Sequence, residues 1–128
     1  MPAGPKGPTH PAKQGRFTLL TYNVAGLPQL VSPSWPAVNV PLISPLLNLY
    51  DVALVQEDFS YHAELERHAN HPYRTESMRQ SLALMPDGLN QFSRFPIAWT
   101  HRVRWNKCNG YFDDASDCLA ERRVPPFT

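Results

Sequence analysis

Two apolar segments with polar ends constrain the fold of this chain most strongly. Residues 17–24 read FTLLTYNV and residues 50–58 read YDVALVQED. Runs of this length and composition are typical of buried strands, and the nearly continuous apolar character of the first predicts a sheet covered on both faces. Asn23 closes the first run and Glu57 the second. These ends predict oxygen donors at the rim of one sheet, which suit Mg²⁺ or Ca²⁺ better than zinc.

The residues between the two runs predict how the strands pair. Ser44-Pro45 before an apolar stretch predicts a short helix, because serine is a good cap and proline a good first helical residue. Prolines 33, 36 and 41 predict a surface loop over residues 29–41. A strand, a helix and a strand in this order predict a right-handed crossover with parallel pairing. The expected fold class is therefore α/β.

Further along, the pattern predicts a second helix and a pair of strands. Apolar side chains share one face over residues 60–69, which favours a helix. Residues 74–85 and 89–100 alternate enough for two strands, joined at the turn tripeptide Pro86-Asp87-Gly88. Residues 1–15 contain little apolar content and are expected to form a flexible tail. Residues 16–128 are then expected to belong to a single domain.

Composition limits the class of protein without selecting a partner. The chain has 128 residues, 42% of them hydrophobic, and a formal net charge of +1. This nearly balanced charge neither requires nor excludes a nucleic-acid partner. No run of about 18 apolar residues occurs, so the sequence predicts no transmembrane segment. The first sixteen residues lack the apolar core of a signal peptide.

Three stretches in order carry a resemblance to a known family. They read LTYNV over residues 20–24, DVALVQE over residues 51–57 and DGLNQFSRFPI over residues 87–97. Together they resemble the opening of the endonuclease/exonuclease/phosphatase superfamily, which includes deoxyribonucleases, abasic-site nucleases, inositol phosphatases and neutral sphingomyelinases. The resemblance covers about Arg16 to Leu119. The SRFPI motif, followed by a cysteine-containing segment, most resembles the bacterial and sphingomyelinase-like branches.

The resemblance implies a fold, a chemistry and a pair of site residues. It implies the N-terminal part of a two-sheet α/β sandwich of the deoxyribonuclease type. It also implies hydrolysis of a phosphodiester with Mg²⁺ or another divalent cation, a lipid headgroup being favoured over nucleic acid. Asn23 and Glu57 match the family's metal and catalytic positions. The family's later histidine, Asp-x-Asn and Asp-His motifs are not found, so the expectation is a truncated hydrolase or a non-catalytic remnant.

The site residues also have plainer interpretations. Asn23 could simply form a turn before Ala25-Gly26, and Glu57 could be a solvated residue at a strand end. Asp58 and Gln56 alternate away from Glu57 and are expected to be structural.

The histidines and cysteines suggest further features. His62, His68 and His71 are expected on a solvent-exposed helix face, because no cysteine or acidic partner completes a metal-binding set. Cys108 and Cys118 are the candidate disulfide, with two free thiols as the alternative. A disulfide would indicate a secreted or periplasmic protein, although the chain shows no signal peptide. The sequence leaves the oligomeric state open.

Overall fold

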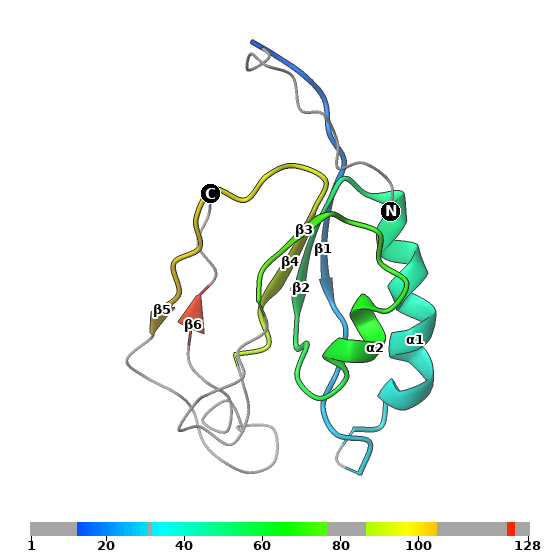
Figure 1. The fold of residues 1–128 in the computed structure, drawn as a ribbon. Coiled ribbons are helices and arrows are strands. Elements are labelled where there is room, and N and C mark those ends of the chain that lie inside the picture. The colour runs from blue at the N-terminus through cyan, green and yellow to red at the C-terminus, as the bar shows by residue number, and fades with distance from the viewer. Residues whose placement is uncertain (1–12, 31, 77–86, 105–122, 125–128) are drawn as a thin grey trace.

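A computed structural model of the protein describes residues 13–30, 32–76, 87–104 and 123–124 (Figure 1). The first half forms strand β1, helix α1, a single 3₁₀ turn η1, strand β2 and helix α2. Their bounds are Leu19–Asn23, Pro36–Leu46, Leu47–Leu49, Val52–Gln56 and His62–Glu66. The described residues of the second half contribute short strands. These are β3 (Tyr73–Arg74), β4 (Asn90–Ser93), β5 (Val103–Arg104) and β6 (Arg123–Val124).

A four-stranded sheet in the order β1-β2-β4-β3 forms the centre of the described structure. β1 and β2 are parallel, and their register runs from Leu19 opposite Val52 to Asn23 opposite Gln56. β4 is antiparallel to both of its neighbours, and β5 and β6 pair separately. The α/β class, the two core strands and their parallel pairing are therefore confirmed.

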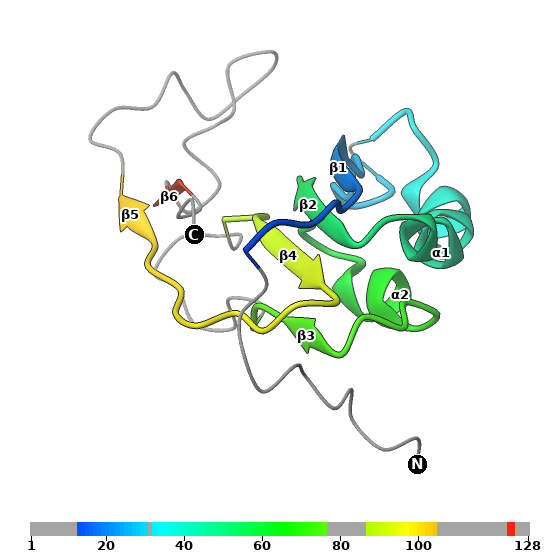
Figure 2. The ribbon, with the colours of Figure 1, turned by 90° about the horizontal axis from the view of Figure 1, so that it is seen from above.

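Both helices pack on one face of the four-stranded sheet, and β5 and β6 lie on its other side (Figure 2). The core between helices and sheet is formed by apolar side chains that are at least nine-tenths buried. Burying one such valine, leucine or phenylalanine stabilises the fold by about 1.5–3 kcal/mol. The core residues are Val24, Val40, Leu47, Ala53, Val55, Leu65, Ala69 and Phe92.

Strand β1 is more exposed than its sequence predicts. Four of its five residues are exposed, and only Leu20 is partly buried against the core. The expectation of a sheet covered on both faces is wrong for this strand within the described residues. Within the described residues β1 has β2 as its single neighbouring strand, and both helices pack on one face of the sheet, so the other face of β1 stays open (Figure 2).

Helix α1 begins earlier than predicted. It runs from Pro36 to Leu46, so residues 36–41 are helical and not part of a surface loop. Pro36 occupies the first turn, where its missing N–H is tolerated, but Pro41 and Pro45 lie inside the helix. Packing of Val40 and Ser44 against the core outweighs the local preference of proline to end a helix. The predicted serine cap at Ser44 is therefore wrong.

The remaining predictions are met in part. Helix α2 is five residues long, shorter than the predicted 60–69. The antiparallel pair β3 and β4 is present, but much of the predicted first strand lies at residues 77–86, outside the described part. Residues 1–12, Cys108 and Cys118 also lie outside it, so the tail, the domain limits and the disulfide stay predictions. None of the described helices is long and apolar enough to cross a membrane.

The three histidines near α2 differ in environment, which corrects the expectation of one solvated face. His68 is exposed, whereas His62 is partly buried and His71 is 1% exposed. The Nε2–H of His71 donates to the Tyr50 carbonyl at 2.8 Å. Burial, the largest effect, lowers the pKa of His71 below the ordinary value of 6.5. Its imidazole packs at 6.0 Å from the Phe92 ring and belongs to the core.

Candidate functional site

The carboxyl ends of β1 and β2 form one edge of the sheet. Asn23 is the last residue of β1 and lies in register with Gln56, the last residue of β2, so Glu57 follows at the same edge. Carboxyl ends of adjacent parallel strands are where open α/β sheets present polar side chains to ligands. The structure therefore brings the backbones of Asn23 and Glu57 to neighbouring positions.

Asn23 shapes the turn that leaves β1. Its side-chain oxygen accepts the N–H of Ala25 at 2.8 Å, and Ala25 has a left-handed backbone with φ 50°. Asparagine forms such turns readily because its short side chain can replace a backbone acceptor. The turn-forming role is thus observed, and the exposed side chain retains its amide N–H groups.

Glu57 departs from regular strand geometry. Its φ of 56° is left-handed, a conformation that costs a residue with a Cβ about 1–2 kcal/mol. Regular alternation would carry Glu57 to the face opposite Gln56, and this turn of the backbone interrupts that alternation. Strained residues of this kind persist where the surroundings fix them, frequently at functional sites.

Gly26 holds the two strand ends together. Its N–H donates to the Glu57 carbonyl at 2.8 Å, and its own carbonyl accepts the N–H of Ser60 at 3.0 Å. A Cβ at position 26 would lie 2.6 Å from the Glu57 carbonyl oxygen. Only glycine allows this approach, so Gly26 fixes the backbone of Glu57.

A third loop joins the same edge from β4. The carbonyl of Gly88 accepts the N–H of Asp58 at 3.0 Å. Gly88 has φ 69°, and a Cβ there would lie 2.5 Å from the ring of Phe59. On the other side of this loop, Asp87 forms an ion pair with Arg102. The loops after β1, after β2 and before β4 are therefore linked by backbone hydrogen bonds around Glu57.

Behind this edge lies a buried polar cluster. Asp58 is 1% exposed, and its Oδ2 accepts the amide of Asn90 at 2.8 Å and the Nδ1–H of His62. The other ring nitrogen of His62 lies 3.3 Å from a carboxylate oxygen of Glu66. The Oδ1 atom of Asp58 is buried with no partner among the described residues. The cluster anchors the residue next to Glu57 to both β4 and α2.

The two carboxylates control the protonation of His62. Burial of the imidazole lowers its pKa, but the hydrogen bond to Asp58, the Asp58 charge and the smaller contribution of Glu66 together outweigh burial. The pKa of His62 consequently lies above its ordinary value of 6.5. A protonated His62 donates from both ring nitrogens and neutralises the buried Asp58.

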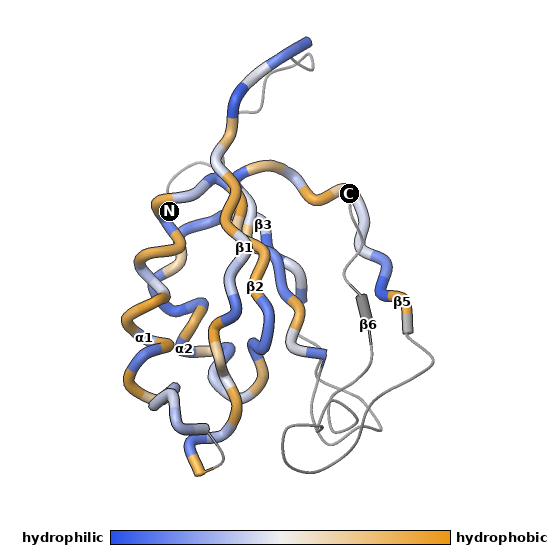
Figure 3. The backbone as a smooth tube through the Cα atoms, turned by 180° about the vertical axis from the view of Figure 1, so that it is seen from behind, coloured by the Kyte–Doolittle hydropathy of each residue, from blue (hydrophilic) through white to orange (hydrophobic). Residues whose placement is uncertain are grey.

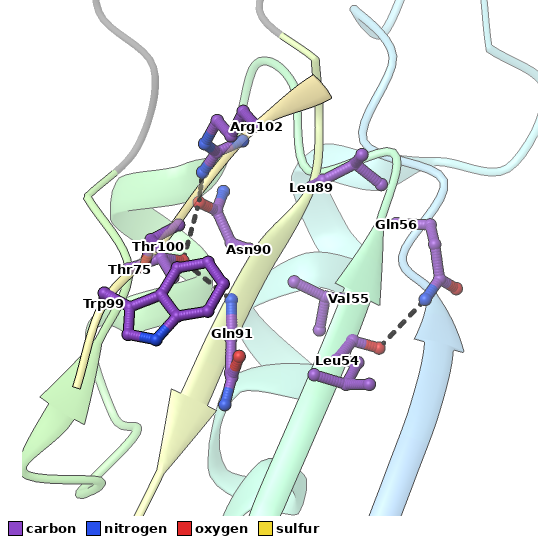
Figure 4. A pocket seen from close by; sticks show the side chains of 10 residues that line it. All are labelled: Leu54, Val55, Gln56, Thr75, Leu89, Asn90, Gln91, Trp99, Thr100 and Arg102. Atoms are coloured by element: carbon purple, nitrogen blue, oxygen red, sulfur yellow. Dashed lines mark hydrogen bonds between the residues drawn. The ribbon is translucent and has the colours of Figure 1, made fainter. Parts of the chain in front are cut away.

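A pocket opens on the sheet beside this edge (Figure 4). It is lined by the ends of β2 and β4, including Gln56 and Gln91, and by the segment that contains Trp99 and Arg102. The ring of Trp99 lies over the side of β4 that carries Gln91. The amide of Gln56 donates to the Leu54 carbonyl and to Thr21 Oγ1, both at 3.1 Å. The pocket thus has apolar walls with amide groups at the candidate site's edge.

Sequence reasoning found the two strand-end residues but missed the cluster behind them. The separation of four between Asp58 and His62 was the available signal, because it suits an acid–histidine pair at the start of a helix. Asn90 lies within the DGLNQF motif, but its partner could be identified only from the pairing of β2 with β4. Among the described residues, no group of three or more histidine, cysteine, aspartate or glutamate side chains could hold a metal ion.

Solved structures define the class of fold. The crystal structure of SmcL superposes with a TM-score of 0.67 at 19% identity, over 85% of this chain and 41% of that one. Beta toxin from Staphylococcus aureus, crystallised with bound magnesium ions, gives 0.63 at 17% identity, over 82% of this chain and 41% of that one. The described structure is therefore part of a deoxyribonuclease I-like α/β fold.

Sequence comparison places the chain within this class. It is 40% identical over 102 residues to a sphingomyelinase of Mycobacterium tuberculosis, over 73% of this chain and 21% of the relative. The chain thus spans about a fifth of the length of that relative. No family model matches the sequence. These similarities confirm the resemblance to the endonuclease/exonuclease/phosphatase superfamily, and to its sphingomyelinase-like branch, over the matched residues.

Proposed function

We propose that this chain contributes Asn23 and Glu57 to a Mg²⁺-dependent phosphodiesterase site that acts on a sphingomyelin-type lipid. The main supporting observation is the parallel pairing of β1 with β2. In this pairing Asn23, the last residue of β1, lies opposite Gln56, and Glu57 follows directly. The 40% identity to a sphingomyelinase supports the reaction class, and the magnesium ions in the beta toxin structure support the metal.

The donor chemistry of these residues fits a hard cation. Glu57 is partly exposed, and within the described part of the chain the hydrogen bonds of this loop use its backbone carbonyl and leave its carboxylate available. A carboxylate oxygen is a preferred Mg²⁺ ligand. Asn23 already uses its side-chain oxygen in the turn. The side-chain NH₂ group of Asn23 is therefore suited to donate to a phosphate oxygen. The side-chain oxygen retains one lone pair for a metal.

A bound Mg²⁺ would neutralise phosphate charge and lower the pKa of an attacking water. The residues of this chain position that chemistry. Gly26 and Asp58 fix the backbone on either side of Glu57 through the contacts described above. Among the described residues, no group of three or more histidine, cysteine, aspartate or glutamate side chains could hold a metal ion, so Glu57 and Asn23 form an incomplete donor set within that part of the chain.

A lipid substrate fits better than nucleic acid. A nucleic-acid enzyme gains much of its affinity from lysine and arginine contacts to phosphates. The net charge of this chain is only +1, and the pocket beside the candidate site is lined mainly by uncharged side chains. The second candidate function is a non-catalytic remnant of such a domain, which the incomplete donor set favours.

Metal binding and hydrolysis separate these possibilities. Titration of the purified chain with Mn²⁺, followed by electron paramagnetic resonance, should show a site weakened at least about tenfold by Glu57→Ala, since even outer-shell groups contribute that much to metal affinity. Asn23→Ala should give a smaller loss. Glu76→Ala is the matched control, because Glu76 is exposed and remote in sequence from the loops of the site.

The Mn²⁺ affinities are then compared with the rate at which the same proteins hydrolyse sphingomyelin. Hydrolysis that needs Mg²⁺ and disappears in Glu57→Ala supports the enzyme. Metal binding at Glu57 without hydrolysis supports the non-catalytic remnant. Equal Mn²⁺ affinity in the wild type and Glu57→Ala would contradict the site.

A further inference from the structure

Helix α1 is apolar on its outer side as well as its inner side. Val40 and Ser44 are buried against the core, as expected for a helix packed on a sheet. On the opposite side, large apolar side chains are more than half exposed. They are Trp35 (65%), Val38 (57%), Leu42 (63%), Leu46 (56%) and Leu49 (71%). A surface helix ordinarily presents charged and polar residues there.

These side chains form one continuous stripe. Val38, Leu42, Leu46 and Leu49 are spaced by four, four and three residues, which keeps them on a single side of the helix and its 3₁₀ extension, and Trp35 precedes them as the residue that caps the helix. Leu30, in the connection before the helix, is 99% exposed and adds to the same region of the chain. Figure 3 shows the apolar colour along most of α1. We call Trp35, Val38, Leu42, Leu46 and Leu49 the α1 outer face.

The segment that carries this face contains no charge. No aspartate, glutamate, lysine, arginine or histidine occurs anywhere in residues 17–50. Attraction to anionic lipids or to nucleic acid requires lysine and arginine, which this face lacks. An uncharged face of this kind is therefore suited to a surface that carries no net charge.

Trp35 stands at the start of the stripe in an unusual conformation. Its φ of 53° is left-handed, which is exceptional for so bulky a residue. The geometry is held by the N–H groups of Val38 and Asn39, which both donate to the Trp35 carbonyl at 3.0 Å. Tryptophan is enriched where an apolar phase meets water, because its ring is apolar and its N–H is polar.

The stripe begins near the candidate site. Ser34, next to Trp35, donates its hydroxyl to the carbonyl of Ala25 at 3.4 Å, in the turn that follows Asn23. The amino end of α1 therefore lies at the same end of the fold as the carboxyl end of β1 (Figure 1). A surface lying along the α1 outer face would pass close to that edge.

We propose that the α1 outer face docks this protein onto a zwitterionic lipid bilayer. Apolar side chains enter the headgroup region and Trp35 lies at the boundary with water, while the absence of charge suits lipids whose headgroups carry no net charge. The proposal rests on the proposed function, because it would bring the candidate site to a membrane that contains its lipid substrate.

Flotation with phosphatidylcholine vesicles in EDTA tests docking without the metal site. The wild-type chain should float with these vesicles, with little dependence on salt. Leu42→Glu/Leu46→Glu should lower the partition coefficient at least about tenfold, because the variant loses the apolar area of two leucines and each new charge opposes insertion. Circular dichroism checks that this variant is folded, which is expected because both side chains are exposed.

Two matched comparisons sharpen the result. Trp35→Ala should weaken flotation, whereas Trp99→Ala should not, although the two side chains are similarly exposed at 65% and 60%. Glu57→Ala should float like the wild type in EDTA, so a failed metal site leaves the docking result intact.

Three outcomes would overturn the docking proposal. One is no flotation of the wild type with phosphatidylcholine. Another is flotation with anionic vesicles alone that disappears at high salt. The third is a dimer in analytical ultracentrifugation that Leu42→Glu/Leu46→Glu converts to a monomer, with no vesicle binding by the wild type.

Discussion

Asp58 is the residue that most strongly links the candidate site to the interior. It follows Glu57 directly, yet its carboxylate is buried and bonded to Asn90 and His62. A buried carboxylate costs several kcal/mol of desolvation unless partners compensate it. Protonated His62 provides that compensation, and one carboxylate oxygen still lacks a partner within the described part of the chain. The stability of this edge should therefore depend on the charge of His62.

The first prediction concerns the pH dependence of that interaction. Because the folded-state pKa of His62 is raised, its contribution to stability is fully present below the ordinary value of 6.5 and is lost as pH rises through the folded-state pKa. We expect His62→Gln to reduce the free energy of unfolding more at pH 5.5 than at pH 9. Urea unfolding followed by circular dichroism at a series of pH values measures this difference.

His71 provides the internal comparison, because its shift has the opposite sign. Its folded-state pKa is lowered by burial, so its contribution is present above 6.5 and is lost as pH falls through the lowered pKa. Comparing the wild type with His62→Gln at each pH cancels the effect of His71, which both proteins contain. A loss of stability in His62→Gln that is constant across pH would show that His62 acts by packing alone.

At the scale of elements, the strand ends depend on Gly26. We expect Gly26→Ala to lower the free energy of unfolding by about 2 kcal/mol, as for other overpacked sites, because the added Cβ meets the Glu57 carbonyl oxygen at 2.6 Å. Gly15→Ala is the matched control, since a Cβ there meets nothing within 4 Å. Thermal unfolding of both variants measures the effect. Equal melting temperatures of Gly26→Ala and Gly15→Ala would contradict the close contact between position 26 and the Glu57 carbonyl.

The sequence predicted strands better than helices, for a physical reason. The apolar runs that became β1 and β2 have strong local preferences, and their parallel pairing follows from the length of the connection between them. Helix α1 contains Pro36, Pro41 and Pro45, and local preference therefore argued against it. Its start is determined by packing on the sheet, which is a property of tertiary structure and not of the local sequence.

At the scale of the whole molecule, the fold family could be recognised from three short motifs. The likeness to deoxyribonuclease I-like structures confirms that recognition, and the chain covers 41% of SmcL. The roles of Asn23 and Glu57 stay predictions. The Asp58 cluster could not be predicted, because it joins residues 58, 62 and 90, whose proximity depends on the pairing of β2 with β4.

The lack of charge in residues 17–50 has a consequence for proteolysis. Trypsin cuts after lysine and arginine, and none occurs between Arg16 and Arg67, which are both exposed. We expect native digestion to yield residues 17–67 as a single peptide that contains β1, α1, β2 and α2. Pairing of β2 with β4 should keep this peptide bound to the rest of the protein in size-exclusion chromatography, with mass spectrometry to identify it.

Separation of the peptide on nicking would contradict that expectation. If the nicked protein stays together, Asn23, Glu57 and the whole α1 outer face lie on one exchangeable piece. That piece could then be replaced by a synthetic copy carrying an isotope or a fluorophore at any chosen position.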